Sequence, residues 1–63
     1  MTISQLKSGD RIRNANRTFL IKRFDADKRG NRYVVAYDEA DKSKYPGAHC
    51  FYDDQLSAMR RAI

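Results

Sequence analysis

Short stretches in which hydrophobic and polar residues alternate predict strands along most of this chain. In the segment at 10–13, Ile12 falls on one face of a strand, while Arg11 and Arg13 fall on the other. The residues at 8–10 predict a turn before this strand, and those at 14–16 predict a turn after it. The chain therefore opens with a short strand that has one apolar and one basic face.

The next stretch, TFLIKRFD at 18–25, is rich in residues that favour strands. Its alternation is imperfect, because Phe19 and Ile21 share one face and Phe24 falls on the opposite one. A bulge near 22–23 would restore the pattern, and strong curvature with apolar cover on both faces would also explain it.

A polar loop follows, in which Gly30 suits the left-handed position of a hairpin. The strand expected at 32–38 carries Tyr33, Val35 and Tyr37 on one face. We expect Tyr33 and Tyr37 to serve the core, so this face would be the buried one.

HCFY at 49–52 predicts a fourth strand, with Cys50 as a small core residue and His49 half-buried on the other face. The tail at 53–63 predicts a helix that begins at an acidic cap and ends near two arginines. Its apolar residues share one helical face and are expected to cover the open end of a barrel: Leu56, Met59 and Ile63.

The order of these segments resembles that of the small Src-homology-3-like barrels of bacteria, plasmids and phages. LKSGDRIR, TFLIKRFD, RYVVAYD and HCFYDDQL carry the resemblance, over about residues 6–56. It implies a mainly β fold, an antiparallel barrel of four to five strands with a short C-terminal helix, in one domain over 1–63. The family is broad and includes KOW and Tudor-like modules, so the resemblance does not define a function.

Composition narrows the class of protein. A chain of 63 residues forms one small domain, and its single cysteine excludes an internal disulfide. That cysteine usage favours the cytoplasm, and since the first ten residues have no apolar core we expect no signal peptide. No apolar run reaches the length that a membrane-spanning helix needs. The net charge of +5 is uneven, since residues 1–35 hold nine Lys or Arg and three Asp. A basic half suggests an anionic partner.

Catalytic or metal chemistry is not expected. Cys50 and His49 are adjacent in a strand and point to opposite faces, so they cannot form a nucleophile–base pair. DADKRG at 25–30 resembles the opening of a calcium loop, but Arg29 and Ala36 occupy positions where ligands are needed. We therefore predict a protein that is not an enzyme and has no cofactor or metal.

The hydrophobic ends and basic middle of 21–35 suggest a hairpin that lies along phosphates, with exposed tyrosines stacking on bases. Asp25 and Asp27 interrupt this basic run, which supports a rival hypothesis: a phage or mobile-element module that docks on a host protein through the hairpin or a sheet edge. A homodimer through the 56/59/63 face is a third option. The predicted nucleic-acid-binding residues, for DNA or RNA with low sequence specificity, are Arg11, Arg13, Arg17, Lys22, Lys28, Arg29, Arg32, Tyr45 and Tyr52.

Overall fold

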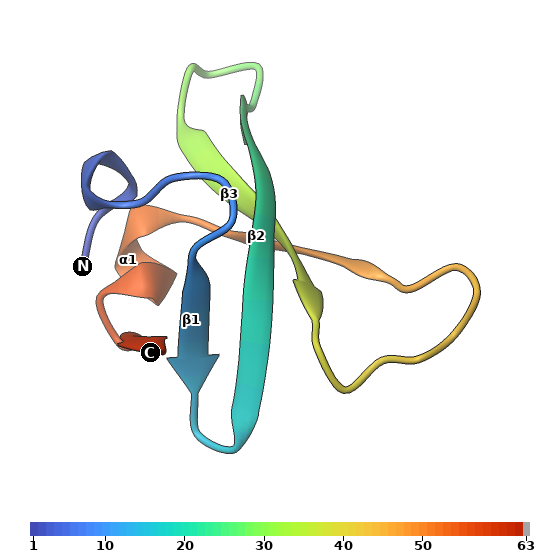
Figure 1. Ribbon diagram of the computed structural model, residues 1–63. Helices are drawn as coiled ribbons and strands as arrows, with labels where there is room; N and C mark the ends of the chain where they lie inside the picture. Colours follow the sequence, from blue (N-terminus) through green and yellow to red (C-terminus); the bar gives the residue numbers. More distant parts are fainter. Residues whose placement is uncertain (63) are drawn as a thin grey trace.

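The computed structural model describes residues 1–62 and shows one antiparallel sheet of five strands (Figure 1). A short 3-10 helix, η1, precedes the strands, and a single helical turn, α1, lies between the last two. The spatial order of the strands is β4-β3-β2-β1-β5, so β4 and β5 form the edges. The elements are η1 (Ile3–Gln5), β1 (Arg11–Asn14), β2 (Arg17–Ala26), β3 (Arg32–Asp38), β4 (Ala48–Phe51), α1 (Asp53–Leu56) and β5 (Arg60–Ala62).

The mainly β prediction is confirmed, whereas a closed barrel is not detected: no pairing joins β4 to β5 in the described residues. The first strand, its turn and the hairpin at Gly30 lie where the sequence placed them. Gly9 and Gly30 have φ angles of 94° and 86°, which residues with a Cβ rarely adopt.

The expected bulge is present in β2. The pairing of β2 with β3 shifts register between Ile21 and Arg23, which leaves Lys22 as the extra residue. Phe24 thereby returns to the same side as Ile21 and packs against the core. The bulge explains how one long strand keeps its apolar side chains inward on both sides of Lys22.

The core lies between the inner face of this sheet, η1 and the segment after β4. On β3, Val34 and Ala36 have exposed fractions of 0% and point inward. The prediction that Tyr33 and Tyr37 serve the core is therefore wrong, since both are half-buried on the opposite face. The buried core cluster consists of Ile3, Leu6, Ile12, Phe19, Ile21, Val34, Ala36, Leu56 and Met59.

The C-terminal helix expected over 53–63 is wrong beyond Leu56. Two hydrogen bonds of the i to i+3 kind follow α1, from Ala58 N–H to the Gln55 carbonyl and from Met59 N–H to the Leu56 carbonyl. These tight turns keep Leu56 and Met59 in the core, while Arg60–Ala62 pairs with β1 as β5. A strand at this edge satisfies backbone groups of β1 that a longer helix would leave unpaired.

The burial of Leu56 and Met59 also tests the dimer interface that the sequence suggested. Leu56 and Met59 are buried inside their own chain, with exposed fractions of 0% and 6%, so they do not offer an interface. Ile63, the third member of that predicted face, lies outside the described residues.

Candidate nucleic-acid interface

Strand register gathers a set of side chains on the face of the sheet opposite the core, which we call the outer face. Directly paired residues in antiparallel strands project to the same side. Tyr37 pairs with Leu20 and Ala48, and Leu20 pairs in turn with Arg11. One continuous row thus runs from β1 across β2 and β3 to β4.

Two further rows lie beyond the bulge residue, Lys22, along β2. Val35 pairs with Arg23 and Cys50, and Tyr33 pairs with Asp25. We define the outer face by its members on β2, β3 and β4, together with the residue that follows β4. These are Leu20, Arg23, Asp25, Tyr33, Val35, Tyr37, Cys50 and Tyr52.

Cys50 is exposed on this face, so the prediction of a buried core cysteine is wrong. His49 faces the other way, as expected, and is half-buried with its ring centroid 5.0 Å from that of Phe19. The side chains of β4 therefore alternate as the sequence predicted, but the buried face is the one with His49 and Phe51 and not the one with Cys50. Phe51, on the same side as His49, also packs on Phe19, at 5.0 Å.

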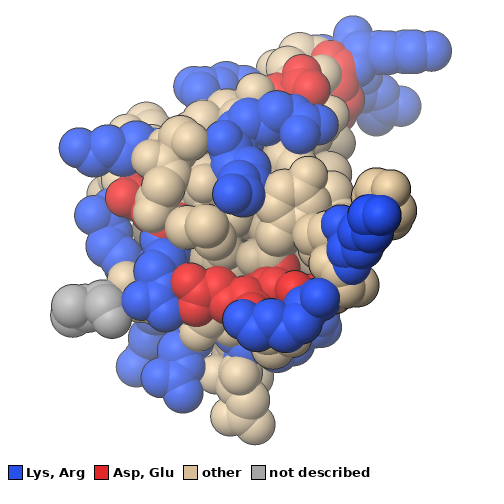
Figure 2. Space-filling view, turned by 45° about the vertical axis from the view of Figure 1, so that its right-hand side comes forward, with Lys and Arg blue, Asp and Glu red and all other residues tan. Residues whose placement is uncertain are grey.

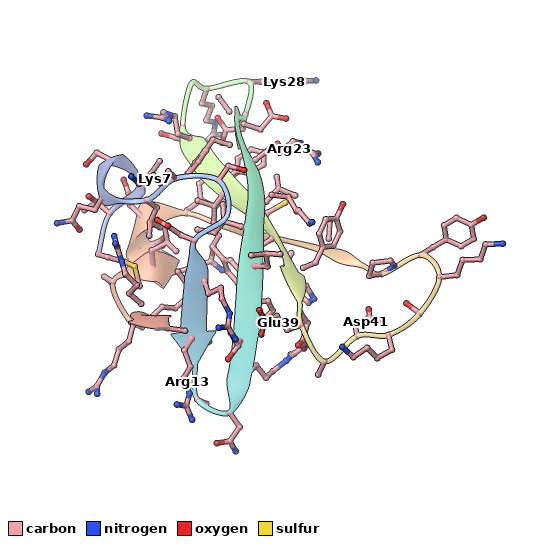
Figure 3. All side chains as sticks on the ribbon, viewed as in Figure 1. Lys7, Arg13, Arg23, Lys28, Glu39 and Asp41 are labelled. Carbon is pink, nitrogen blue, oxygen red and sulfur yellow. The ribbon has the colours of Figure 1, made fainter. Side chains whose placement is uncertain are left out.

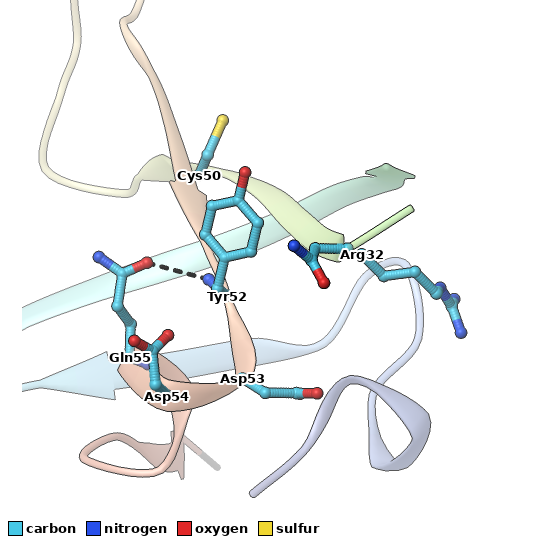
Figure 4. Close-up of a pocket in the computed structure, with 7 residues that line it drawn as sticks. Arg32, Cys50, Tyr52, Asp53, Asp54 and Gln55 are labelled. Atoms are coloured by element: carbon cyan, nitrogen blue, oxygen red, sulfur yellow. Dashed lines mark hydrogen bonds between the residues drawn. The ribbon is translucent and has the colours of Figure 1, made fainter. Parts of the chain in front are cut away.

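Tyr52 joins the outer face to the β2–β3 loop. Its ring lies 5.4 Å from that of Tyr33, and its hydroxyl donates to Asp27 Oδ2 at 3.2 Å. Desolvation, followed by the bond to the Asp27 carboxylate, raises the pKa of the Tyr52 hydroxyl. Figure 4 shows Tyr52 at a hollow that Arg32, Cys50 and the first residues of α1 also line.

The β2–β3 loop presents Lys28 and Arg29 to solvent, and we call these residues the hairpin tip. Asp27 does not form an ion pair with either; its Oδ1 accepts the backbone N–H groups of Arg29 and Asn31, each at 2.9 Å. These bonds, led by the one from Asn31, lower the pKa of Asp27. The carboxylate holds the loop in shape and leaves the cations exposed.

Carboxylates act differently at the start of β1 and β2. Arg11 donates to both oxygens of Glu39, at 2.6 and 2.7 Å, and Arg17 contacts Asp38 at 2.8 Å. The hydrogen bond from Arg11 is the main cause of the lowered pKa of Glu39. Asp38 also has a lowered pKa, first through the Ala40 backbone N–H and then through Arg17. Arg11 and Arg17, although predicted ligands of nucleic acid, are therefore partly neutralised.

Arg60 and Arg61, which the sequence assigned to the end of a helix, are exposed on the strand that lies beside β1. Arg60 and Arg61 lie on β5, where Arg60 pairs with Arg13 and Arg61 pairs with Ile12. The residue types were visible in the sequence, but their location depends on β5 pairing with β1. We call Arg13 and Arg60 the arginine pair.

The predicted site residues do not form one continuous basic surface. Lys28 lies at one end of the long β2 strand and Arg13 lies near the other, as Figure 3 shows. Lys22 is exposed at the bulge, and the Arg32 guanidinium lies 5.9 Å from the centre of the Phe24 ring. Tyr45, with an exposed fraction of 83%, lies on the loop that projects between β3 and β4 in Figure 1. On the face shown in Figure 2, basic side chains surround an uncharged area, and acidic groups gather in separate places.

Comparison of the chain with protein-family models, with curated proteins and with solved structures gives no match. Within residues 1–62, no group of three or more His, Cys, Asp or Glu residues is placed to hold a metal ion. In the same residues, no helix has the length and apolar character that a membrane span requires. The chain's own residues must therefore carry any functional argument.

Proposed function

We propose that this protein is a small non-enzymatic module that binds nucleic acid, DNA or RNA, on its outer face with low sequence specificity. One observation carries the proposal: half-buried tyrosines lie in registered rows on the outer face, between the hairpin tip and the arginine pair. Tyr33 and Tyr37 lie in these rows, and Tyr52, directly after β4, has its ring 5.4 Å from that of Tyr33.

The chemistry of this face suits a single strand. Aromatic rings stack on bases of any sequence, whereas Lys and Arg neutralise the phosphates that join them. Half-buried rings are held in place by the sheet, so little side-chain entropy is lost when a base stacks on them. Contacts made mainly to backbone and base faces carry little sequence information, which gives the low specificity.

Acidic residues of the basic run fit this proposal in different ways. Asp27 accepts hydrogen bonds from two backbone N–H groups and from the Tyr52 hydroxyl, so its carboxylate stabilises the loop and repels a phosphate less than a free carboxylate would. Asp25 is exposed and pairs with Tyr33 on the outer face. A phosphate path would avoid Asp25 and run on the side of Arg23.

The relationship to small Src-homology-3-like barrels is part of the proposal. The strongly bulged β2, the antiparallel hairpins and the short α1 before the last strand support it. A cytoplasmic location, expected from cysteine usage, belongs to the proposal as well. Neither is needed for the outer face to bind a strand.

The test is an NMR titration of the labelled protein with a 12-nucleotide poly-dT or poly-U strand, and with a matched duplex, at low and moderate salt. We expect shifts on Tyr33, Tyr37 and the hairpin tip that weaken as salt rises. The absence of shifts at low salt would overturn the proposal. A duplex that shifts these residues more than either single strand would refute stacking as the mode of binding.

Docking on a protein is the second candidate, and the open edge of the sheet favours it. In the described residues β4 pairs only with β3, so a partner strand, from a host protein or a second copy, could add to its free side. The projecting loop with Tyr45 lies before this edge. Such docking would depend on Tyr45 and change little with salt, which separates it from nucleic-acid binding.

A further inference from the structure

The arginine pair places two like charges directly opposite each other. Arg13 on β1 and Arg60 on β5 are Cα partners, and both side chains are exposed. Residues so paired in antiparallel strands project to the same side with Cβ atoms about 4.5–5.5 Å apart, and like charges in this arrangement destabilise a sheet. An anion bound between the two guanidinium groups would offset this repulsion.

That anion is not a carboxylate of the described chain. Within residues 1–62, the recorded ion pairs are those of Arg11 with Glu39 and Arg17 with Asp38. Arg13 uses its Nε–H on the Ala15 carbonyl at 3.1 Å, in a turn where Ala15 has a φ of 54°. A guanidinium carries five N–H donors, so this bond orients Arg13 and leaves its terminal N–H groups for a ligand.

Arg61, the neighbour of Arg60, provides a contrast. Its Nη2 donates to the Gln5 carbonyl at 2.6 Å, which joins β5 to η1. Arg61 therefore has a structural partner inside the chain, whereas no hydrogen bond is recorded for the Arg60 side chain in the described residues.

Space for a ligand is present at the arginine pair. Arg13 and Arg60 line two adjoining hollows, one completed by Ala15 and Ala58 and the other including Thr18. The alanines are small, which leaves room beside the guanidinium groups. An oxyanion between the two arginines would receive N–H donors from both sides.

We propose that Arg13 and Arg60 form a discrete site for one phosphate group of a nucleic-acid backbone. This inference rests on the proposed function and extends it, because it assigns a phosphate to a position outside the predicted hairpin. The phosphate relieves the repulsion between the arginines, so binding and edge-strand stability are coupled.

The experiment compares the Arg13→Gln/Arg60→Gln variant with a Lys42→Gln/Lys44→Gln control, which has the same change in charge on the β3–β4 loop. Thermal unfolding without ligand uses Arg60→Gln, which keeps the Arg13 bond to the Ala15 carbonyl. Its Tm should be a few degrees higher than that of the wild type, since repulsion is removed, and the Tm of Lys44→Gln should not. A Tm of Arg60→Gln that is equal to or lower than that of the wild type would contradict a repulsive pair and overturn the site.

Binding is then measured with the 12-nucleotide strand, and with inorganic phosphate as the smallest probe, by the NMR signals of the Arg13 and Arg60 Nε–H groups. We expect both probes to shift these signals and the arginine variant to lower the salt slope of strand binding by about one. Shifts from inorganic phosphate alone would overturn the assignment to a backbone phosphate. Strand-induced shifts confined to the tyrosines and the hairpin tip would overturn this site and leave the proposed function standing. The absence of strand-induced shifts anywhere would overturn both.

Discussion

The hairpin tip and the start of β1 both place carboxylates beside basic side chains, with different results. At the tip, Asp27 accepts backbone N–H groups and the Tyr52 hydroxyl, so Lys28 and Arg29 stay free of ion pairs with it. At β1, both carboxylate oxygens of Glu39 accept hydrogen bonds from Arg11, one from Nε and one from Nη2. Sequence charge is therefore a poor guide to the field at the surface, because hydrogen bonding decides which cations remain available.

The largest expected effect comes from removing the available cations at both ends together. The variant Arg13→Gln/Lys28→Gln/Arg29→Gln/Arg60→Gln should lose measurable strand binding at moderate salt, and its salt slope at low salt should fall by about three. Fluorescence anisotropy with a labelled strand measures this. All four side chains are exposed, so circular dichroism should show a folded protein. Binding that persists with an unchanged slope would refute a role for these cations.

Stacking should give the next largest effect. Replacing Tyr37 with Ala removes an outer-face ring and should weaken binding by about 1–3 kcal/mol with little change in salt slope. The matched control is Tyr45→Ala. The sequence predicted Tyr45 as a stacking residue, but it lies on the projecting loop outside the registered rows, so its loss should leave strand binding unchanged. If Tyr45→Ala were the more damaging change, docking through the β4 edge and its loop would be the better account.

A smaller effect concerns Asp25, the acidic residue on the outer face. Asp25→Asn removes a negative charge beside Tyr33 and should strengthen strand binding at low salt by a few-fold. Asp41→Asn, on the projecting β3–β4 loop, is the control with the same change in charge. Equal strengthening in the two variants would mean that net charge alone governs binding.

The pH dependence of stability separates the roles of the acidic groups further. Asp27 has a lowered folded pKa, so its stabilisation is present above the unfolded pKa of about 4 and is lost as pH falls through the folded value. Tyr52 has a raised pKa, so its stabilisation is present below about 10 and is lost as pH rises through the folded value. Denaturant unfolding of Asp27→Asn and Tyr52→Phe should show a reduced acid and alkaline dependence, respectively. An unchanged acid profile for Asp27→Asn would contradict the backbone hydrogen bonds that hold Asp27, and an unchanged alkaline profile for Tyr52→Phe would contradict the desolvation of Tyr52 and its bond to Asp27.

Sequence pattern predicted the strands well where the signal is local. In a regular strand Phe24 would fall on the face opposite Ile21, and this break in the alternation predicted the bulge near Lys22. Gly30 predicted the hairpin. The wrong burial of β3 has a clear cause: alternation defines two faces, but the buried one depends on pairing with β2. Ala36 lies opposite Ile21 and Val34 lies opposite Phe24, so the smaller residues face the core.

The C-terminal error has a similar origin. Leu56 and Met59 are three residues apart, which a helix and a pair of tight turns satisfy equally well. Only the free edge of β1 selects a strand at 60–62, and that brings Arg60 to Arg13. Likewise, Arg11 meets Glu39 across 28 positions of sequence, so local pattern could not show which arginines are neutralised.

The most direct test of the central claim is the salt slope of strand binding for two variants that remove the same charge. Arg13→Gln removes an available cation, whereas Lys44→Gln removes one from the projecting loop, where its Nζ lies 5.7 Å from the centre of the Tyr45 ring. We predict that Arg13→Gln lowers the slope, by no more than the drop of about one expected for the whole arginine pair, and that Lys44→Gln leaves it unchanged. Equal slopes in the two variants would contradict the claim that available cations on registered strands, and not total charge, bind the phosphates.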